Sequence, residues 1–368
     1  MREISARRFV VKIGTNTICR SDGTIDQSYL ESVAKQVMDL DSEGFEAIIV
    51  TSGAIGSGTT ELGMERKPKD MGAKQACAAV GQAMLMMAWR DAFRKHGKCV
   101  GQVLLTYGAF SDRIRYLNLK KAMDEMLKLG AIPIVNENDV IATDEIEEIF
   151  GDNDKLSALV ASKIDADLLI LLTDVDGLYD RNPEVDPDAR LISTVDEITK
   201  DIERIAGKNT SERSVGGMHT KIAAARIAMQ SGVNMVIANG RTKDIIYRVA
   251  RGEELGTLFT ASVKYNNKQR WILFAGPRGK INVDKGAEKA VREGKSLLPC
   301  GITSVEGRFK KGDVVRIGAF AKGMSNFSSA DLPKLLEKCS QEKAAGNGKV
   351  GNNSVVVSNE NIVLLDQI

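Results

Sequence analysis

The feature of this sequence that most limits its possible folds is a series of short, nearly continuous apolar runs separated by segments of helical periodicity. A run that is apolar at every position is typical of a strand buried on both faces of a parallel sheet. The alternation favours an α/β fold with an open, mostly parallel sheet sandwiched by helices. The candidate strands are Phe9–Ile13, Ala47–Thr51, Val100–Thr106, Ala131–Val135, Leu168–Thr173 and Asn234–Ala238.

The clearest helix follows Asp26, a residue type suited to an N-cap. Gly44 stands where such a helix would end, as a residue that tolerates positive φ. Between them, apolar residues recur at the spacing of one helix face. These residues are Leu30, Val33, Ala34, Val37 and Met38.

The alternating pattern ends near residue 259, and a chain of 368 residues is longer than a single core usually supports. We predict a main domain over residues 1–259, a linker over 260–277, a second domain over 278–358 and a C-terminal tail over 359–368. The second domain has short β-like runs and one helical segment, which favours a small β-barrel-like domain. The predicted runs are Lys280–Val283, Ile302–Val305, Val314–Ile317 and Ser354–Ser358, the helix is Ala287–Glu293, and Gln341–Asn353 is a predicted loose loop.

Five scattered cysteines and two histidines exclude several kinds of chemistry. No C-x-x-C pair occurs, so neither a disulfide framework nor a zinc knuckle fits. With only His96 and His219, a multi-histidine metal site is not possible, and a His-dependent triad would need one of these two. No apolar run is long enough to cross a membrane and the N-terminus has no secretory signal, so we expect a cytoplasmic protein without membrane partners.

The formal net charge of +2 hides an uneven distribution. Residues 277–368 contain 15 Lys and Arg against 10 Asp and Glu, which gives this part +5, whereas residues 1–276 carry −3. A basic domain is compatible with RNA binding, but ten acidic residues dilute the excess, and a mild excess usually marks a solvated surface.

Two lysines stand close to glycine turns, where backbone N–H groups and an ammonium together can bind an anion. Lys12 lies in Val11-Lys12-Ile13-Gly14, and Lys221 ends Gly216-Gly217-Met218-His219-Thr220-Lys221. A third turn, Ser52-Gly53-Ala54, follows a strand, at the end where open parallel sheets bind ligands. Glycine also serves strand-to-helix turns for geometric reasons alone, but two such lysines on one sheet indicate charge neutralisation of a transferring phosphoryl group.

Two clusters of Asn and Asp lie near the fourth strand. The first is Asn136-Glu137-Asn138-Asp139, and the second is Asp152-Asn153-Asp154 at the start of a predicted helix. Turn and N-cap chemistry accounts for either cluster by itself. Carboxylate and amide oxygens are also the acceptors that a bound ammonium group needs, so both interpretations stay open. Neither a Walker A loop nor a dinucleotide fingerprint is present, because Lys289 and Glu61 stand where the required glycines would be.

Six motifs, in this order and spacing, resemble the glutamate 5-kinases of the amino-acid kinase family. They are VVKIGT, VTSGAI, VNENDV, GDND-LSALVA, LLTDVDGLY and GGM-TK. Three later motifs, VDKGAEKAV, SLLPCGI and FKKGDVVRI, are similar to the PUA domain attached to many such kinases. The resemblance implies an amino-acid kinase fold over residues 1–259 and a PUA domain over residues 278–358.

This resemblance also implies an activity, which is transfer of the ATP γ-phosphate to the side-chain carboxylate of L-glutamate as the first step of proline synthesis. ATP and Mg²⁺ would be required, proline would act as feedback inhibitor, and the chain would form a homo-oligomer. The product, γ-glutamyl phosphate, would pass to glutamate-semialdehyde dehydrogenase.

The resemblance also implies roles for the residues that stand at matching positions of these motifs. The implied catalytic residues are Lys12, Lys221, Asp154 and Gly53, with Gly14 offering a further backbone N–H. The implied glutamate ligands are Ser52, Asp139, Asn153 and Asn136, with Asp139 binding the α-ammonium. The implied nucleotide ligands are Lys12, Thr173, Asp174, Gly216, Gly217, Met218, His219, Thr220 and Lys221, and Asp152 would lie near Mg²⁺.

The sequence departs from the family pattern in the last motif. Val215 stands where a threonine commonly precedes the two glycines, and His219 occupies a position that is usually small or polar. An ionised carboxylate needs no deprotonation before it attacks phosphorus, so His219 fits a helix-cap or surface role better than that of a catalytic base.

Three other interpretations remain. A related kinase could act on N-acetylglutamate or aspartate, although an acylated amine would not require Asp139. The chain could bind RNA through its basic domain, which we do not favour. The small domain could also be a structural or oligomer-forming appendage, which is the interpretation we prefer.

Overall fold

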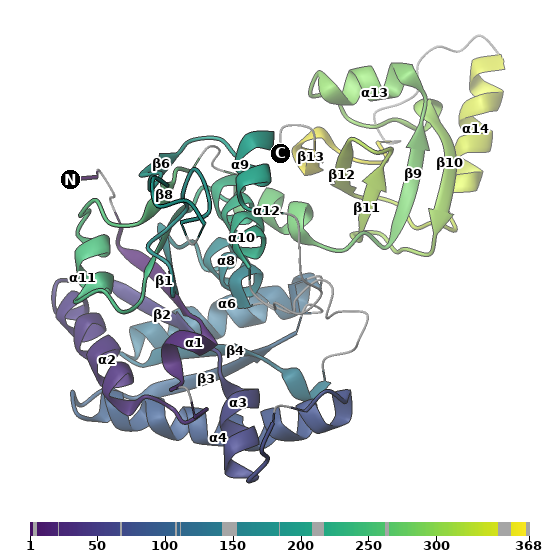
Figure 1. Cartoon of the computed structure of the whole chain (residues 1–368). Coiled ribbons are helices and arrows are strands. Elements are labelled where there is room, and N and C mark those ends of the chain that lie inside the picture. Colours follow the sequence, from purple (N-terminus) through teal and green to yellow (C-terminus); the bar gives the residue numbers. More distant parts are fainter. Residues whose placement is uncertain are drawn as a thin grey trace. The chain divides into compact units, whose positions relative to one another are not determined.

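The computed structural model describes residues 1–2, 6–20, 22–66, 68–106, 109–110, 112–141, 153–183, 185–207, 217–261, 265–344 and 355–365. The chain forms two compact units (Figure 1). The first comprises Met1–Ala109 and Ile114–Lys264, and the second comprises Phe110–Arg113 and Tyr265–Ile368. In the part of the chain that is described, no helix has the length and apolar character needed to cross a membrane.

The first unit contains an eight-stranded sheet with strand order β3-β4-β2-β1-β5-β7-β8-β6. Every neighbouring pair is parallel except β7 and β8, which confirms the predicted mostly parallel sheet. All six predicted strands are present within one or two residues. The strands are β1 (Arg8–Ile13), β2 (Glu46–Val50), β3 (Val100–Leu105), β4 (Ile132–Glu137), β5 (Leu168–Thr173), β6 (Thr194–Val195), β7 (Asn234–Asn239) and β8 (Thr257–Phe259).

The strands at the centre of this sheet are buried on both faces. Alternate residues of β1, namely Phe9, Val11 and Ile13, belong to one apolar core cluster, and Val10 between them is equally inaccessible to solvent. Because successive side chains of a strand point to opposite faces, both faces must be covered. In β5 all six residues are buried, which explains its unbroken apolar sequence.

Helices cover the sheet of the first unit, and α2 lies against α11 while α8 lies against α10 (Figure 1). The prediction for α2 is confirmed, because the Asp26 side chain accepts a hydrogen bond from the Tyr29 N–H and Gly44 has φ +87°. The helices of this unit are α1 (Thr15–Ile18), α2 (Gln27–Ser42), α3 (Ala54–Glu61), α4 (Met71–Arg94), α6 (Arg113–Lys128), α8 (Asn153–Lys163), α9 (Lys200–Ile205), α10 (Met218–Gln230) and α11 (Ile245–Ala250), with a 3-10 turn η1 (Asp139–Ile141).

The second unit contains a five-stranded sheet with order β10-β9-β11-β12-β13 around its own apolar core. The strands are β9 (Gly279–Val283), β10 (Ile302–Gly307), β11 (Val314–Ile317), β12 (Ala321–Met324) and β13 (Ile362–Leu364). The helices are α12 (Asn267–Phe274), α13 (Lys285–Arg292) and α14 (Leu332–Ala344), with 3-10 turns η2 (Pro299–Gly301) and η4 (Asn359–Asn361). The first three of the four predicted strands, Lys280–Val283, Ile302–Val305 and Val314–Ile317, are present, and so is the predicted helix.

Four segments of the second unit differ from the sequence prediction. Residues 260–277, expected as a linker, include α12, whose polar first turn is a capping box made by Asn266 and Gln269. Residues 359–368, expected as a tail, include β13, which pairs with β12. Of Ser354–Ser358, expected as a strand, the described residues 355–358 form a single bridge, between Val357 and Leu297. Helix α14 extends into the predicted loop Gln341–Asn353, and residues 345–353 lie outside the described residues.

Candidate active site

Predicted site residues gather at the carboxyl ends of four adjacent strands. Lys12 is the fifth residue of β1, Ser52 follows β2, Asn136 is in β4 and Thr173 ends β5. These strands are neighbours in the order β4-β2-β1-β5. Because they are parallel, their carboxyl ends open on the same edge of the sheet, where α/β proteins bind ligands.

At the centre of this edge, two lysines share one carboxylate. Asp154, in the first turn of α8, has no solvent exposure; its Oδ1 accepts a hydrogen bond from Lys12 Nζ, and its Oδ2 lies 3.3 Å from Lys221 Nζ. Lys12 and Lys221 are only 5% and 6% exposed. The Thr220 hydroxyl also donates to Asp154 Oδ2, at 3.0 Å. The shared carboxylate holds two ammonium groups close together at the strand ends, an arrangement suited to contacts with phosphate oxygens.

Two predicted site residues at the strand ends are glycines, each for a different reason. A Cβ atom on Gly14 would lie 3.7 Å from Lys12 Nζ, so a longer side chain there would compete for the space near the ammonium. Gly53 has φ +101°, which L-residues rarely adopt, and a Cβ atom there would lie 3.0 Å from Ile18 Cγ2. The tight turn between β2 and α3 therefore requires glycine and presents backbone N–H groups at the start of α3.

Helix α10 brings its N-terminus to the same place as Lys221. Gly217 is its N-cap, and Met218, His219, Thr220 and Lys221 form its first turn. The partial positive charge of a helix N-terminus adds to that of the lysine. His219 is half-buried, and Gly217 is packed closely enough that a Cβ there would lie 3.1 Å from His219 Nδ1. Gly216 and Val215 lie outside the described residues.

Three of the predicted glutamate ligands are joined by hydrogen bonds. The Asn153 amide nitrogen donates to the Thr51 carbonyl at 2.7 Å, the Ser52 hydroxyl at 3.0 Å and Asn136 Oδ1 at 2.9 Å. Asn136 Nδ2 in turn donates to Gln82 Oε1 at 2.8 Å. Since Asn153 directly precedes Asp154, this amide cluster adjoins the charged cluster along α8.

Two further residues were predicted near this cluster, Asp139 as a glutamate ligand and Asp152 as a neighbour of Mg²⁺. Asp139 is half-buried in η1, which follows β4 and contacts α4. It lies at the same edge of the sheet, and its binding to an ammonium stays a prediction. Asp152 lies outside the described residues.

The predicted nucleotide ligands Thr173 and Asp174 lie at the end of β5. Thr173 Oγ1 donates to Asp174 Oδ1 at 3.0 Å, and Asn16 Nδ2 lies 3.4 Å from Asp174 Oδ2. Burial acts to raise the pKa of Asp174, but these hydrogen bonds and the charge of Lys221 outweigh it and lower the pKa below the ordinary value. The Asp174 carboxyl group is therefore ionised at neutral pH, as an oxygen ligand of a metal ion must be.

Three residues of this edge were missed by sequence reasoning. Asn16 follows Gly14, and Asn239, which ends β7, donates to Asp176 at 2.9 Å. Both asparagines follow predicted strands, so the rule that located the other residues could have found them. Gln82 gave no such signal, because it lies inside the long helix α4.

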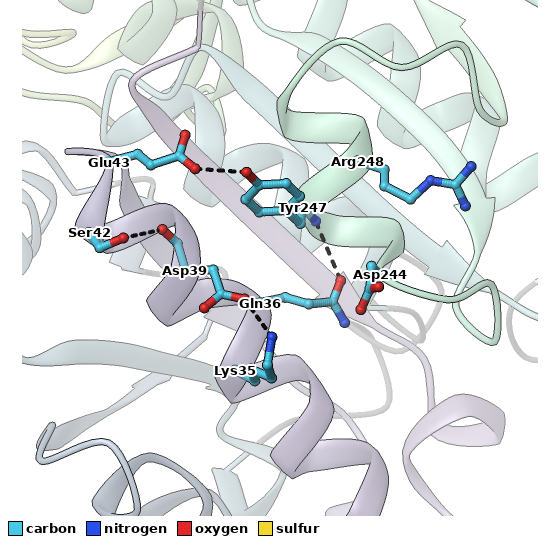
Figure 2. A pocket seen from close by; sticks show the side chains of 8 residues that line it. All are labelled: Lys35, Gln36, Asp39, Ser42, Glu43, Asp244, Tyr247 and Arg248. Carbon is cyan, nitrogen blue, oxygen red and sulfur yellow. Dashed lines mark hydrogen bonds and ion pairs between the residues drawn. The ribbon is translucent and has the colours of Figure 1, made fainter.

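A separate pocket of about 450 Å³ lies between α2 and α11 and shares no residue with this site. Its lining residues are engaged with each other, since the Tyr247 hydroxyl donates to Glu43 at 2.8 Å and Gln36 Oε1 accepts from the Tyr247 N–H at 3.4 Å (Figure 2). The lining residues are Lys35, Gln36, Asp39, Ser42, Glu43, Asp244, Tyr247 and Arg248.

A buried lysine pair at the strand ends of a parallel sheet is suited to phosphoryl transfer, and comparison with known proteins agrees. The sequence profile of the amino acid kinase family matches residues 7–239, and that of the PUA domain matches residues 279–344. The chain belongs to the amino acid kinase family. A solved UMP kinase from Bacillus anthracis shares the fold, with a TM-score of 0.50 and 17% identity over 70% of this chain and 97% of that one.

Within this family, the chain is similar to proteins named glutamate 5-kinase. The protein of that name from Methanosarcina mazei is 48% identical over 98% of this chain and 97% of its own length. The one from Methanosarcina barkeri is 47% identical over the same shares, and the one from Caldanaerobacter subterraneus is 45% identical over 89% and 90%.

Proposed function

We propose that this protein transfers the γ-phosphoryl group of ATP to the side-chain carboxylate of L-glutamate. The observation that carries the proposal is the pair Lys12 and Lys221, held by Asp154 next to the amide cluster of Asn153, Asn136 and Ser52. The relatives named glutamate 5-kinase cover nearly the whole chain, which supports glutamate as the acceptor.

In this reaction, a γ-carboxylate oxygen of glutamate forms a bond to the γ-phosphorus of ATP. The bond from that phosphorus to the β,γ-bridging oxygen breaks, and its electron pair leaves with ADP. Negative charge on the phosphoryl oxygens is stabilised by Lys12 and Lys221, which Asp154 keeps in place before substrate arrives. Because the attacking carboxylate is already ionised, no general base is required, and His219 has no proton to remove.

Binding of the two substrates divides between the two sides of the lysine pair. Ser52, Asn136 and Asn153 supply hydroxyl and amide groups for glutamate, and Asp139 supplies a carboxylate for its α-ammonium. On the other side, Thr173, Asp174 and the first turn of α10 hold the nucleotide. The Gly216 and Gly217 turn belongs to the same proposal.

Magnesium fits this site as a partner of the phosphates. No cluster of three potential metal-ligating side chains occurs among the described residues. Mg²⁺ commonly uses only one or two carboxylates, with phosphates and water completing its coordination. Asp174, which is ionised, can supply one of them, and Asp152 can supply another. When bound, Mg²⁺ neutralises part of the charge on the phosphates.

The proposal is tested by incubating the purified chain with ATP, Mg²⁺, hydroxylamine and either L-glutamate, L-aspartate or N-acetyl-L-glutamate. We expect γ-glutamyl hydroxamate with glutamate and at most traces of product with the other two. Product with aspartate but not with glutamate would refute the assignment. The variant Asp139→Ala should raise the KM for glutamate strongly and leave the KM for ATP little changed, because its carboxylate faces only the amine side in this scheme.

A further inference from the structure

Helix α4 contributes a glutamine to the proposed glutamate site. Gln82 is 9% exposed, and its Oε1 accepts the hydrogen bond from Asn136 Nδ2. Seven residues further along the same face of α4, Trp89 Nε1 donates to Thr51 Oγ1 at 3.1 Å. Residues i and i+7 of a helix lie on one face, so this face of α4 is bonded at two points to the carboxyl ends of β2 and β4.

The backbone holds Gln82 in this position firmly. A Cβ atom on the preceding residue, Gly81, would lie 1.9 Å from the Ala54 carbonyl oxygen of α3. Helices α3 and α4 therefore pack backbone against backbone at this point, and the helix cannot shift without losing that contact.

The direction of each amide in the cluster follows from one backbone group. The Thr51 carbonyl can only accept, so the nitrogen of Asn153 must face it. That nitrogen also donates to Asn136 Oδ1, which turns Asn136 Nδ2 toward Gln82. The chain of donors and acceptors thus runs from Asn153 through Asn136 and ends at Gln82 Oε1.

The remaining donor of Gln82 indicates that the residue is not present for stability. Gln82 Nε2 is buried and has no hydrogen-bond partner among the residues that the structure describes. A buried amide with an unpaired donor destabilises a fold relative to an apolar side chain of the same size. Such exceptions are typical of functional sites.

We propose that Gln82 is a positioning residue of the glutamate site, which acts by accepting the Asn136 Nδ2 hydrogen bond and so holding the Asn136 side chain in place beside Asn153. This inference rests on the proposed function, in which both asparagines bind glutamate. Without an acceptor at position 82, Asn136 Nδ2 loses this partner, so the Asn136 side chain is held only through Oδ1 and can shift away from Asn153. Glutamate then meets an amide group that is less well positioned, whereas the nucleotide side is unchanged.

The test is a kinetic comparison of Gln82→Met with the full-length wild type in the hydroxamate assay. Methionine has a similar length and no strong acceptor, so we expect the KM for glutamate to rise about tenfold and the KM for ATP to stay within about twofold. The melting temperature should change little, because the variant removes one unpaired donor, Gln82 Nε2, and creates another, Asn136 Nδ2. As a matched control, Leu85→Val alters a buried residue one turn further along α4 and should leave both KM values unchanged.

A double-mutant cycle with Asn136→Ala separates action through Asn136 from other effects. If Gln82 acts through Asn136, Gln82→Met adds no further rise in the KM for glutamate when Asn136 is already absent. The same added factor in both backgrounds would overturn the inference, as would an equal rise of both KM values or an unchanged KM in Gln82→Met. A wild type that forms no γ-glutamyl hydroxamate would instead remove the proposed function, and the positioning role with it.

Discussion

At the scale of single residues, Asp154 organises the charged cluster of the site. It is fully buried, holds two lysines and stands in the first turn of α8, where a negative charge is also favoured by the helix dipole. A carboxylate in this position holds Lys12 and Lys221 in place without any substrate. The site is therefore ordered before the reaction, and the lysines need not reorganise to meet the transferring group.

The role of Lys221 can be tested by Lys221→Met, which removes one of the two charges beside the transferring group. We expect kcat to fall by about 10²- to 10³-fold with a smaller effect on the KM for glutamate, because the lysine acts on charge that develops in the transition state. Lys163→Met is the matched control. Lys163 is a buried lysine in the last turn of α8, where it lies 4.9 Å from the Tyr116 ring, so kcat should stay near the wild-type value. A similar loss in both variants would contradict this role.

The variant Asp154→Asn should affect stability as well as activity. It leaves Lys12 and Lys221 beside a neutral amide, and removing one partner of a buried ion pair destabilises a protein by about 3–5 kcal/mol. Because an anion can replace the lost charge, inorganic phosphate should raise the melting temperature of this variant more than that of the wild type. Equal shifts in scanning calorimetry would count against an anion site between the lysines.

Most residues of the site could be predicted, and the exceptions have a physical reason. Ser52, Asn136 and Asn153 follow apolar runs, so the sheet edge that collects them could be inferred before their hydrogen bonds were seen. Thr220, expected to contact the nucleotide, donates a hydroxyl hydrogen bond to Asp154, and its contact with the nucleotide stays a prediction. Gln82 reaches the site from the side of a helix, and nothing in a helical sequence pattern says which neighbour a buried glutamine will meet.

At the scale of elements, close contact between α3 and α4 depends on glycine. A Cβ atom on Gly81 would overlap the Ala54 carbonyl, so Gly81→Ala must separate the two helices. We expect a loss of about 1–3 kcal/mol in the free energy of unfolding, measured by urea denaturation, with a raised KM for glutamate because Gln82 moves too. Gly72→Ala, in the first turn of α4, is the control and should change stability by less than about 1 kcal/mol. Equal stability losses would argue against a special contact at Gly81.

In the second unit, Lys322 of β12 joins the end of α12 to the sheet. Its Nζ donates to the Leu273 and Ala275 carbonyls at 2.8 Å and 3.1 Å, and burial, aided by the charge of Arg316, lowers its pKa to about 8. An unfolded lysine has a pKa of about 10.4. Between these values the unfolded chain binds more protons, so the contribution of Lys322 to the free energy of unfolding increases as the pH rises.

This pH dependence can be isolated by the variant Lys322→Met. Relative to this variant, the wild type should gain on the order of 2 kcal/mol of stability between pH 7 and pH 10. Trp271, buried in α12, reports unfolding of this unit by fluorescence when Trp89 is replaced by phenylalanine in both proteins. Exposed Lys310 supplies the control, because Lys310→Met should follow the wild type at every pH. A constant difference between Lys322→Met and the wild type would show that Lys322 does not titrate in this range.

Elements with a strong pattern were predictable, and those formed by tertiary contacts were not. Strand β5 is apolar throughout because it is buried on both faces, which makes it visible in the sequence. Strands β6 and β8 have only two and three residues and are defined by their pairing, β6 with β8 and β8 with β7. Helix α12 begins with the polar turn of its capping box, which has the composition of a linker.

At the scale of the whole molecule, the two units have separate cores and separate sheets. The first unit ends at Lys264, a few residues after β8, the last strand of its sheet. The +5 charge of residues 277–368 is partly used inside the second unit. Lys322 donates to the Leu273 and Ala275 carbonyls there, so this cation is not available to a nucleic acid, in line with our preference for a structural role.

Because Lys12, Asp154, Lys221 and the amide cluster all belong to the first unit, the reaction should not need the second one. We expect residues 1–264 alone to fold and to form γ-glutamyl hydroxamate with a kcat within about threefold of the full chain, since a unit with its own core can fold independently. Phe110, which is fully buried and groups with the second unit, should be replaced by serine to prevent aggregation. The same Phe110→Ser change in the full chain is the control. A truncated protein that is folded by circular dichroism but inactive would show that the second unit is required for the reaction, either directly or through assembly of several copies.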